Sequence, residues 1–284
     1  MKAKVLIVGC GDLGQRLGVQ LAAQGWRVLG MRRQAQALPA VIEPVLGDVS
    51  NPRCPPLWPQ GELDALVYCV AASQHDEAGY RAAYLQGLQH VLSWLAEHGQ
   101  RPKQLIFTSS TGVYAQRDGQ WIDEQSATEP SRYTGQVMLE AEQCALNSGL
   151  EASVVRLGGI YGPGREHFLG QVRQGAQVLN EPAVYTNRIH IDDAAGLVAH
   201  LLNRAMQGEP LQRCYLGVDN YPAPLHEVVL WLREQLQVQA DPTAAFLSRA
   251  ASKRCSNTLA RDSGWTPLYP TYREGFQAIL SAAQ

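Results

Sequence analysis

Three closely spaced glycines follow a short apolar run at the start of the chain. The run Val5–Val8 is apolar and β-branched, and the pattern Gly9-x-Gly11-x-x-Gly14 comes directly after it. Leucines then recur at helical spacing, so this stretch predicts a strand, a tight turn and a helix. Gly9 allows the tight turn, and Gly11 lets the backbone approach a pyrophosphate. Gly14 lets the helix pack closely on the strand.

A dinucleotide is the ligand that this pattern favours, because the helix N-terminus adds N–H groups and a partial positive charge for phosphate. A structural glycine turn or another nucleotide ligand is the alternative, since methyltransferases carry similar glycine loops. The residues of the loop that are expected to contact the cofactor are Gly9, Gly11, Asp12, Leu13 and Gly14.

Strand-like and helix-like segments alternate along the first half of the chain. Strands are expected at 27–31, 45–46, 64–71, 104–108 and 152–157, and helices at 80–98 and 131–148. This alternation predicts βαβ units, and the continuous apolar strands fit a sheet that is covered on both faces. The expected fold class is therefore α/β, with a Rossmann-type doubly wound parallel sheet.

The pattern becomes irregular after Gly158. A loop is expected at 159–165, a helix at 192–204, a strand at 213–217 and a helix at 224–237. We expect residues 1–157, together with 186–204, to form the dinucleotide-binding domain. Residues 158–284 are expected to form a smaller, interleaved C-terminal domain that covers the substrate.

Two arginines follow the second expected strand, which ends at Met31. An NAD-selective site has an Asp or Glu there for the ribose 2′-hydroxyl, whereas guanidinium groups suit a 2′-phosphate. Arg32 and Arg33 therefore predict NADP as the cofactor, with NAD still open, and a solvated basic turn is the alternative. Asp48 is expected either to accept from the adenine amino group or to be an ordinary turn residue.

Lysine is scarce in this chain, since four lysines accompany twenty arginines and none lies between Lys103 and Lys253. The net charge of −2, without basic runs, argues against nucleic-acid binding. Apolar runs fall short of a membrane span, and Val5–Val8 is too short for a signal peptide, so a cytoplasmic protein is expected. The six cysteines form no C-x-x-C pair, which predicts reduced thiols and no metal site.

Four further segments carry a family resemblance. They are VYCVAAS at 67–73, IFTSSTGVYA at 106–115, RLGGIYGPGR at 156–165 and NRIHIDDAAGLVAHLL at 187–202. In this order they resemble the extended short-chain dehydrogenase/reductases, the NAD-dependent epimerase/dehydratase-like group, from Val5 to about Gln237. The resemblance implies that a cofactor lies over Val70 and Ala71. The glycine loop is one residue shorter than the G-x-x-G-x-x-G usual in that group and is similar to that of the atypical branch.

The resemblance also implies a catalytic pair. Ser110 matches the Ser or Thr that polarises a substrate carbonyl, with Ser109 and Thr111 as fallback candidates. Tyr133, at the start of an expected helix, matches the catalytic tyrosine. The alternatives are plain polar residues at a strand end and an aromatic residue that packs on the core.

Val137 stands where the resemblance places a lysine, four residues after the tyrosine. A tyrosine with an ordinary pKa of about 10 is ionised to roughly one part in a thousand at pH 7. Such a phenol can donate a proton, as carbonyl reduction requires, but it is a poor base for alcohol oxidation. The sequence therefore favours an NADP-dependent reductase of a small carbonyl or nucleotide-linked substrate. The alternatives are a non-catalytic NADP-binding sensor or scaffold, and a nucleotide-sugar epimerase or dehydratase with a different base.

Three arginines are candidate anion ligands. The resemblance places the segments around Arg165 and Arg188 near the substrate, and Arg156 is a further candidate. It also implies that a homodimer could form through the helices at 80–98 and 131–148.

Two further sets of polar residues, at 75–76 and 190–193, could serve either a ligand or the structure. His75 and Asp76 are expected either to contact a ligand or to lie in a surface loop. No chemistry is assigned to His190, Asp192 or Asp193, because Asp192 is expected to cap the following helix.

Overall fold

The computed structural model of the chain describes residues 2–34, 38–247 and 252–282. The chain divides into two compact units. The first comprises Met1–Val113, Thr128–Arg156 and Ala195–Tyr215, and the second comprises Tyr114–Ala127, Leu157–Ala194 and Leu216–Gln284. This grouping differs from the expected division in two places, because 114–127 joins the second unit and the returning segment of the first unit is 195–215.

The first unit is built on a seven-stranded sheet with the order β11-β7-β5-β4-β1-β2-β3. The strands are β1 Lys4–Val8, β2 Arg27–Arg32, β3 Ile42–Leu46, β4 Ala65–Tyr68, β5 Gln104–Ser110, β7 Ala152–Leu157 and β11 Cys214–Gly217. β1 pairs in parallel with β2 and β4, as do β2 with β3 and β4 with β5. The strand order reverses beside β1, so the doubly wound α/β fold predicted from the sequence is confirmed.

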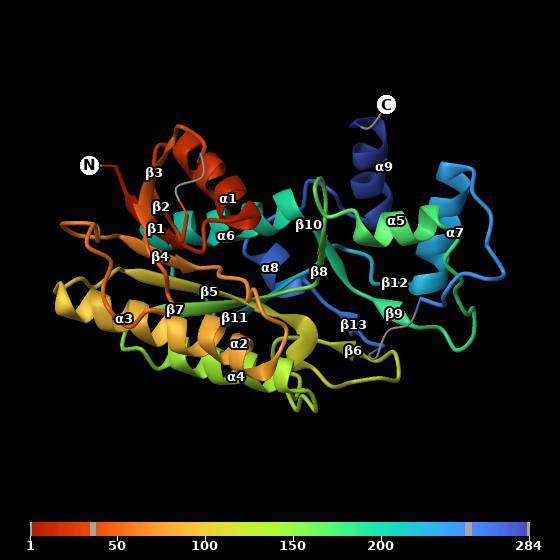
Figure 1. The fold of residues 1–284 in the computed structure, drawn as a ribbon, viewed down its shortest axis with the longest axis horizontal. Coiled ribbons are helices and arrows are strands. Elements are labelled where there is room, and N and C mark those ends of the chain that lie inside the picture. The colour runs from red at the N-terminus through yellow and green to blue at the C-terminus, as the bar shows by residue number, and fades with distance from the viewer. Residues whose placement is uncertain (1, 35–37, 248–251, 283–284) are drawn as a thin grey trace. The chain divides into compact units, whose positions relative to one another are not determined.

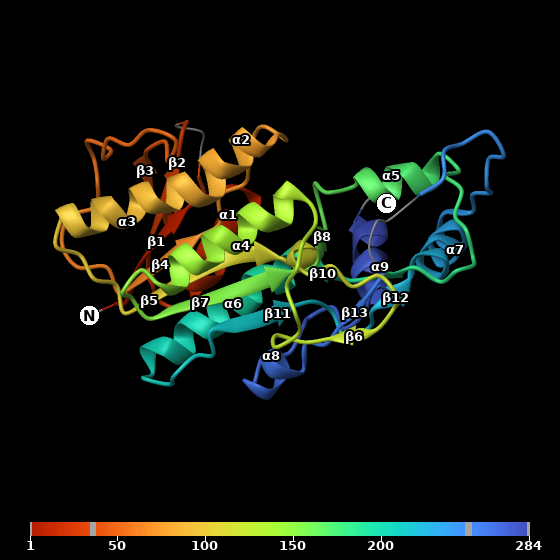
Figure 2. The same cartoon turned by 90° about the horizontal axis from the view of Figure 1, so that it is seen from below.

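Helices cover both faces of this sheet (Figure 1). They include α1 Asp12–Ala23, α2 Glu77–Tyr80, α3 Gly87–Glu97, α4 Tyr133–Leu146 and α6 Ile191–Met206. α3 and α4 lie side by side on one face, as Figures 1 and 2 show, while α1 and α6 lie on the other. α3 buries Leu88, Val91 and Leu95, whose helical spacing is the pattern that predicted this helix.

A π-helix interrupts the single helix expected at 80–98. This element, η1, spans Arg81–Gln86 between α2 and α3. Within it the carbonyl of Ala83 accepts a hydrogen bond from the Tyr68 hydroxyl. The segment is therefore helical as predicted, and its π turn was not foreseen, because such a turn has no periodic signature in the sequence.

Short strands and helices build the second unit. Its strands are β6 Trp121–Ile122, β8 Gly159–Tyr161, β9 Tyr185–Thr186, β10 Arg188–His190, β12 Ala223–Pro224 and β13 Arg254–Cys255. β8 pairs with β10 and β6 with β13 in parallel, whereas β9 and β12 are antiparallel. Its helices include α5 His167–Arg173, α7 Leu225–Leu236, α8 Thr258–Asp262 and α9 Tyr272–Ala282. Val172 of α5, Val228 of α7 and Phe276 of α9 meet in one apolar core.

Two local predictions for this part of the chain were wrong. The segment 159–165 is not all loop, because its first three residues form β8. α6 begins at Ile191, so Asp192 lies inside the first turn and not at the N-cap position. The N–H of Asp192 instead donates to Nδ1 of His190 at 3.3 Å. Among the described residues, no helix is long and apolar enough to cross a membrane.

Candidate cofactor and active site

The register of the sheet aligns the carboxyl ends of the central strands. Val8 lies opposite both Met31 and Tyr68, and Tyr68 lies opposite Phe107. The glycine loop, the arginines after β2, the segment after β4 and the end of β5 therefore share one edge of the sheet, which we call the active-site edge. Ligands of doubly wound sheets bind at this edge, beside the point where the strand order reverses.

Each glycine of the loop has the surroundings that a phosphate cradle needs. Gly9 has a φ of 86°, and a Cβ there would come within 2.5 Å of the Val70 nitrogen. A Cβ on Gly14 would come within 3.1 Å of Ile7 Cγ2, so this glycine lets α1 pack on β1. Among the described residues, the nearest atom to a Cβ on Gly11 is the Gly9 carbonyl oxygen at 3.9 Å, which leaves room beside the turn.

The first turn of α1 completes this cradle. In the described part of the chain, no side chain caps the helix at Gly11. The N–H groups of Asp12, Leu13 and Gly14 are therefore placed to bind an anion. The Asp12 carboxylate accepts from Nε of Arg16 at 2.9 Å, one turn further along the helix. The pyrophosphate of a dinucleotide would thus be held by these backbone N–H groups rather than by the Asp12 side chain.

The segment after β4 lies against the glycine loop. The Val70 backbone packs on Gly9, and Ala71 is exposed at the same edge. Sequence reasoning missed two cysteines here, although both are neighbours of predicted site residues. The Cys69 thiol donates to the Gly9 carbonyl at 3.3 Å, and Cys10 is fully buried. Burial raises the pKa of Cys10 to about 11, so its thiol is a packing group.

Arg32 and Arg33 stand at the end of β2. Arg32 is half-buried and Arg33 is exposed. The charge of Arg32 lowers the pKa of Cys10 against the larger effect of burial, which places this guanidinium near the glycine loop. Asp48 accepts from the N–H and the hydroxyl of Ser50 at 2.9 and 2.8 Å, which fits the turn role.

The hydroxyls at the end of β5 face different surroundings. Ser110 is half-buried, and its Oγ accepts from the Gly112 N–H at 3.0 Å. Ser109 is buried and donates to Glu142 at 2.6 Å, since successive strand residues point to opposite faces. Thr111 is buried as well. Ser110 is therefore the hydroxyl that this strand end can offer to a substrate.

Tyr133 is the first residue of α4. Its hydroxyl donates to the carbonyl oxygen of His75 at 2.5 Å. A Cβ on Gly135 would come within 2.9 Å of a carbonyl oxygen of η2, the 3₁₀ turn at Thr111–Val113. The start of α4 thus packs against the turn that follows Ser110, and the two catalytic candidates stand on touching segments.

Val137, at the position where the lysine is missing, is wholly buried. Its side chain offers Tyr133 neither a charge nor a hydrogen bond. The Tyr133 ring meets Tyr80 edge-on with centroids 5.6 Å apart, and Tyr80 in turn packs on Tyr84 at 5.2 Å. Burial, followed by the two neighbouring phenols, raises the pKa of Tyr80. The ring that packs on Tyr133 is therefore a phenol that stays neutral at pH 7.

His75 and Asp76 belong to the segment that Tyr133 touches. Both are exposed, and His75 meets Tyr133 through its backbone carbonyl. The Asp76 carboxylate caps α2 by accepting from the Gly79 N–H at 2.7 Å. The structure thus gives these two residues roles in shaping the loop.

Arg156, expected as an anion ligand, is engaged inside the protein instead. It is buried, and its Nε and Nη2 donate to the two carboxylate oxygens of Glu142 at 3.0 and 2.7 Å. Glu142 lies on the inner face of α4 and also accepts from Ser109. The bidentate pair ties α4 to β7, and the hydrogen bond from Ser109 ties it to β5.

Arg165 and Arg188 belong to the second unit. Arg165 is exposed, whereas Arg188 is buried and donates to the Thr186 hydroxyl at 2.7 Å. The charge of Arg188 partly counters the burial that raises the pKa of Asp219 to about 7. Of the two arginines, Arg165 is the exposed residue.

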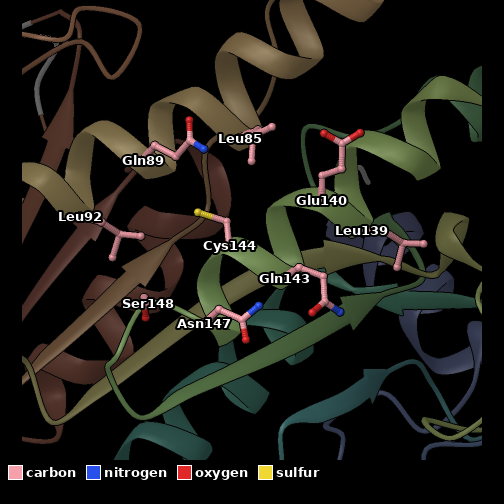
Figure 3. Close-up of a pocket in the computed structure, with 9 residues that line it drawn as sticks. All are labelled: Leu85, Gln89, Leu92, Leu139, Glu140, Gln143, Cys144, Asn147 and Ser148. Atoms are coloured by element: carbon pink, nitrogen blue, oxygen red, sulfur yellow. The ribbon is translucent and has the colours of Figure 1, made fainter.

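A shallow groove runs between α3 and α4 (Figure 3). It is lined by Leu85, Gln89, Leu92, Leu139, Glu140, Gln143, Cys144, Asn147 and Ser148. In Figure 3 the Cys144 thiol points from α4 toward the helix that carries Gln89. The groove belongs to the two helices through which a homodimer is expected, and that dimer stays a prediction.

Comparison with known sequences gives a family. The model described as the NAD dependent epimerase/dehydratase family matches residues 5–215. Protein YeeZ of Escherichia coli K12 is 30% identical over 226 residues, covering 74% of this chain and 77% of its own. A 3-diazoavenalumate denitrifying reductase of a Streptomyces species is 24% identical over 324 residues, covering 96% of this chain and 98% of that protein.

Solved structures agree with this family. A Methylobacillus flagellatus protein, provisionally assigned as an NAD-dependent epimerase/dehydratase, has a TM-score of 0.82 at 35% identity, with 100% of this chain and 99% of that chain covered. The human epimerase family protein SDR39U1, solved with NADPH, has a TM-score of 0.76 at 19% identity over 97% of this chain and 98% of its own, which shows the fold alone. Because the family match spans the glycine loop and the segments that carry Ser110 and Tyr133, this chain belongs to the NAD-dependent epimerase/dehydratase family of NAD(P)-binding proteins.

Proposed function

We propose that this protein is an NADPH-dependent reductase of a small carbonyl compound or a nucleotide-linked substrate, with Tyr133 as the proton donor. The observation that carries the proposal is the wholly buried Val137, at the position where an ammonium group would make Tyr133 a base. Reduction of a carbonyl needs a proton delivered to its oxygen, and a neutral phenol can supply one. Oxidation of an alcohol, with which epimerases and dehydratases begin, needs a proton removed.

The residues of the active-site edge fit the cofactor. The open space at Gly11 and the uncapped start of α1 suit a pyrophosphate. The guanidinium groups of Arg32 and Arg33, at the end of β2, suit a 2′-phosphate, which is why NADPH is favoured over NADH. When bound, NADPH would supply the hydride.

Ser110 would orient the substrate. Its Oγ accepts from the Gly112 N–H, so its own hydrogen can point to a carbonyl oxygen. Tyr133 would donate to the same oxygen as negative charge develops there. The Streptomyces relative is named a reductase, which supports this direction of hydride transfer.

A panel of aldehydes, ketones and nucleotide-linked carbonyls tests the proposal. NADPH oxidation is followed with wild type, Tyr133→Phe and Tyr80→Phe. We expect Tyr133→Phe to lose turnover by at least ~100-fold while NADPH affinity stays unchanged. Tyr80→Phe removes a neighbouring hydroxyl, keeps the ring contact and should stay active. Wild-type turnover in Tyr133→Phe would overturn the assignment.

A non-catalytic NADP-binding sensor or scaffold is the second candidate function. One contact favours it: the Tyr133 hydroxyl is already bonded to the carbonyl of His75. This candidate predicts measurable NADPH affinity and no turnover across the panel. Efficient reduction of any carbonyl would exclude it.

A further inference from the structure

We infer that the first unit carries a binding site for a divalent transition-metal ion of the Zn²⁺ class, formed by Cys54, Glu97 and His98. One ligand atom from each of these side chains lies within 4.8 Å of the other two. A thiolate, a carboxylate and an imidazole are the donor types that Zn²⁺ takes in proteins. Cys54 is half-buried and the other two residues are exposed, so water can complete the coordination.

The loop that holds Cys54 is fastened to α3 and to the residues just after it. Near its start, the carbonyl of Pro52 accepts from Trp94 Nε1 at 3.0 Å. Near its end, Trp58 Nε1 donates to the buried amide of Gln100 at 2.8 Å. The rings of Trp58 and Trp94 pack edge to face with centroids 5.5 Å apart. The thiol is thus held near the end of α3 by contacts that need no ion, and little chain would have to be ordered on binding.

The hydrogen bonding of His98 leaves Nε2 as the ring nitrogen that can ligate. Its Nδ1 lies 2.8 Å from the carbonyl oxygen of Trp94, which can only accept. Nδ1 therefore carries the hydrogen, and Nε2 presents its lone pair. A carbonyl bound to the other ring nitrogen is the usual way in which proteins orient a metal-binding histidine.

The position in the fold also suits a cation. Glu97 is the last residue of α3 and His98 is its C-cap, so both stand at the negative end of the helix dipole. α3 ends shortly before β5 begins, which places the site at the amino edge of the sheet, opposite the active-site edge (Figure 1). The ion would accordingly be structural or regulatory rather than part of the reduction.

Cysteine spacing predicted no metal site, because the three ligands come from two distant segments. Cys54 lies in a proline-rich loop, and the adjacent pair Glu97 and His98 ends a helix. Neither segment has a metal-binding motif by itself. The fold alone brings them together.

A Co²⁺ titration of the reduced, tag-free full chain tests the site. We expect one equivalent of Co²⁺ to produce a thiolate-to-cobalt charge-transfer band that Zn²⁺ displaces. Tryptophan fluorescence should fall with it, because the rings of Trp58 and His98 have centroids 6.0 Å apart. Cys54→Ser should abolish the band, and His98→Ala should weaken Co²⁺ binding by at least ~10-fold.

Cys144→Ser is the matched control, since it removes a half-buried thiol on α4. This variant should keep both signals. Glu97→Gln changes an exposed side chain, so it should weaken Co²⁺ binding while leaving metal-free thermal unfolding unchanged. Absence of the band in wild type, or a wild-type band in Cys54→Ser, would overturn the inference.

Discussion

The hydroxyl of Tyr133 donates a hydrogen bond to the backbone carbonyl of His75, 2.5 Å away. His75 lies on the segment that follows β4, whose Val70 packs on Gly9 of the glycine loop. The proposed proton donor is therefore linked to the same stretch of backbone that shapes the cofactor cradle. A substrate carbonyl would have to replace the His75 carbonyl as the acceptor of this hydrogen.

Two glycines of the cradle should respond differently to alanine. Gly9→Ala places a Cβ within 2.5 Å of the Val70 nitrogen at a φ of 86°, so it should lower the free energy of unfolding by about 2 kcal/mol or more. Gly11→Ala meets no such contact and needs no positive φ, so it should cost less unfolding free energy than Gly9→Ala. NADPH affinity should nonetheless fall, because the new methyl fills the space beside the pyrophosphate. Urea unfolding and calorimetric NADPH titration separate the two effects, and equal stability of both variants would contradict the structure.

Cofactor selectivity should depend on the arginines after β2. Arg32→Ala and Arg33→Ala should each weaken NADPH binding by about 10-fold. This is the loss of affinity expected when one hydrogen bond to a charged group is removed. NADH binding should not change, because it has no 2′-phosphate. Arg101→Ala removes an exposed guanidinium near the start of β5 and serves as the control. Parallel losses of NADH and NADPH affinity would show that neither arginine reads the 2′-phosphate.

The buried ion pair in the first unit should matter far more than an exposed one. Glu142→Ala leaves the buried Arg156 without its bidentate partner and should cost about 3–5 kcal/mol of unfolding free energy. Glu140, on α4 like Glu142, is the exposed partner of Arg81. Glu140→Ala should therefore cost less than about 1 kcal/mol of unfolding free energy. Chemical denaturation of both variants checks the contrast. Similar losses would mean that the Glu142 pair is not buried in solution.

A buried carboxyl in the second unit should contribute stability that is lost as the pH rises. Burial raises the pKa of Asp219 to about 7, partly countered by Arg188, so the folded state keeps a proton that the unfolded state releases near pH 4. Between these pH values the folded Asp219 binds a proton that the unfolded chain lacks, so the contribution of this group to stability declines by up to roughly 4 kcal/mol. Asp193, whose pKa burial raises to about 6, acts with the same sign. Asp219→Asn should remove this contribution, so that its unfolding free energy rises more, or falls less, than that of wild type between pH 4 and 7; an unchanged pH slope would contradict the burial.

Much of the fold could be predicted because individual strands and helices are determined by local sequence patterns. The apolar run Val5–Val8, the glycines and the helical spacing in α3 each predict one element, and alternation predicts the parallel sheet. The pairing of Trp121–Ile122 with Arg254–Cys255 could not be foreseen, because two-residue strands far apart in the chain have no periodic signal. The same long-range contact helps explain why 114–127 joins the second unit.

The sequence indicated where the candidate site residues lie along the strands and the glycine loop, but it could not indicate their side-chain partners. Arg156 was predicted to bind an anion. Its acidic partner Glu142 lies on a different element, so the sequence around Arg156 gives no sign of the ion pair. Glu142 gave a usable signal, since it follows the buried Met138 by one helical turn and so lies on the inner face of α4. The bond between Tyr133 and the His75 carbonyl had no such signal, because any residue could have supplied that oxygen.

The most direct measurement follows a labelled hydride. Wild type and Tyr133→Phe are incubated with the carbonyl panel and NADPH deuterated at the transferred position, and products are analysed by mass spectrometry. We expect wild type to place one deuterium on the former carbonyl carbon for each NADPH consumed, and Tyr133→Phe to do so at least ~100-fold more slowly. Reduction by Tyr133→Phe at the wild-type rate, or turnover of substrate without net consumption of NADPH, would contradict a reductase in which Tyr133 donates the proton.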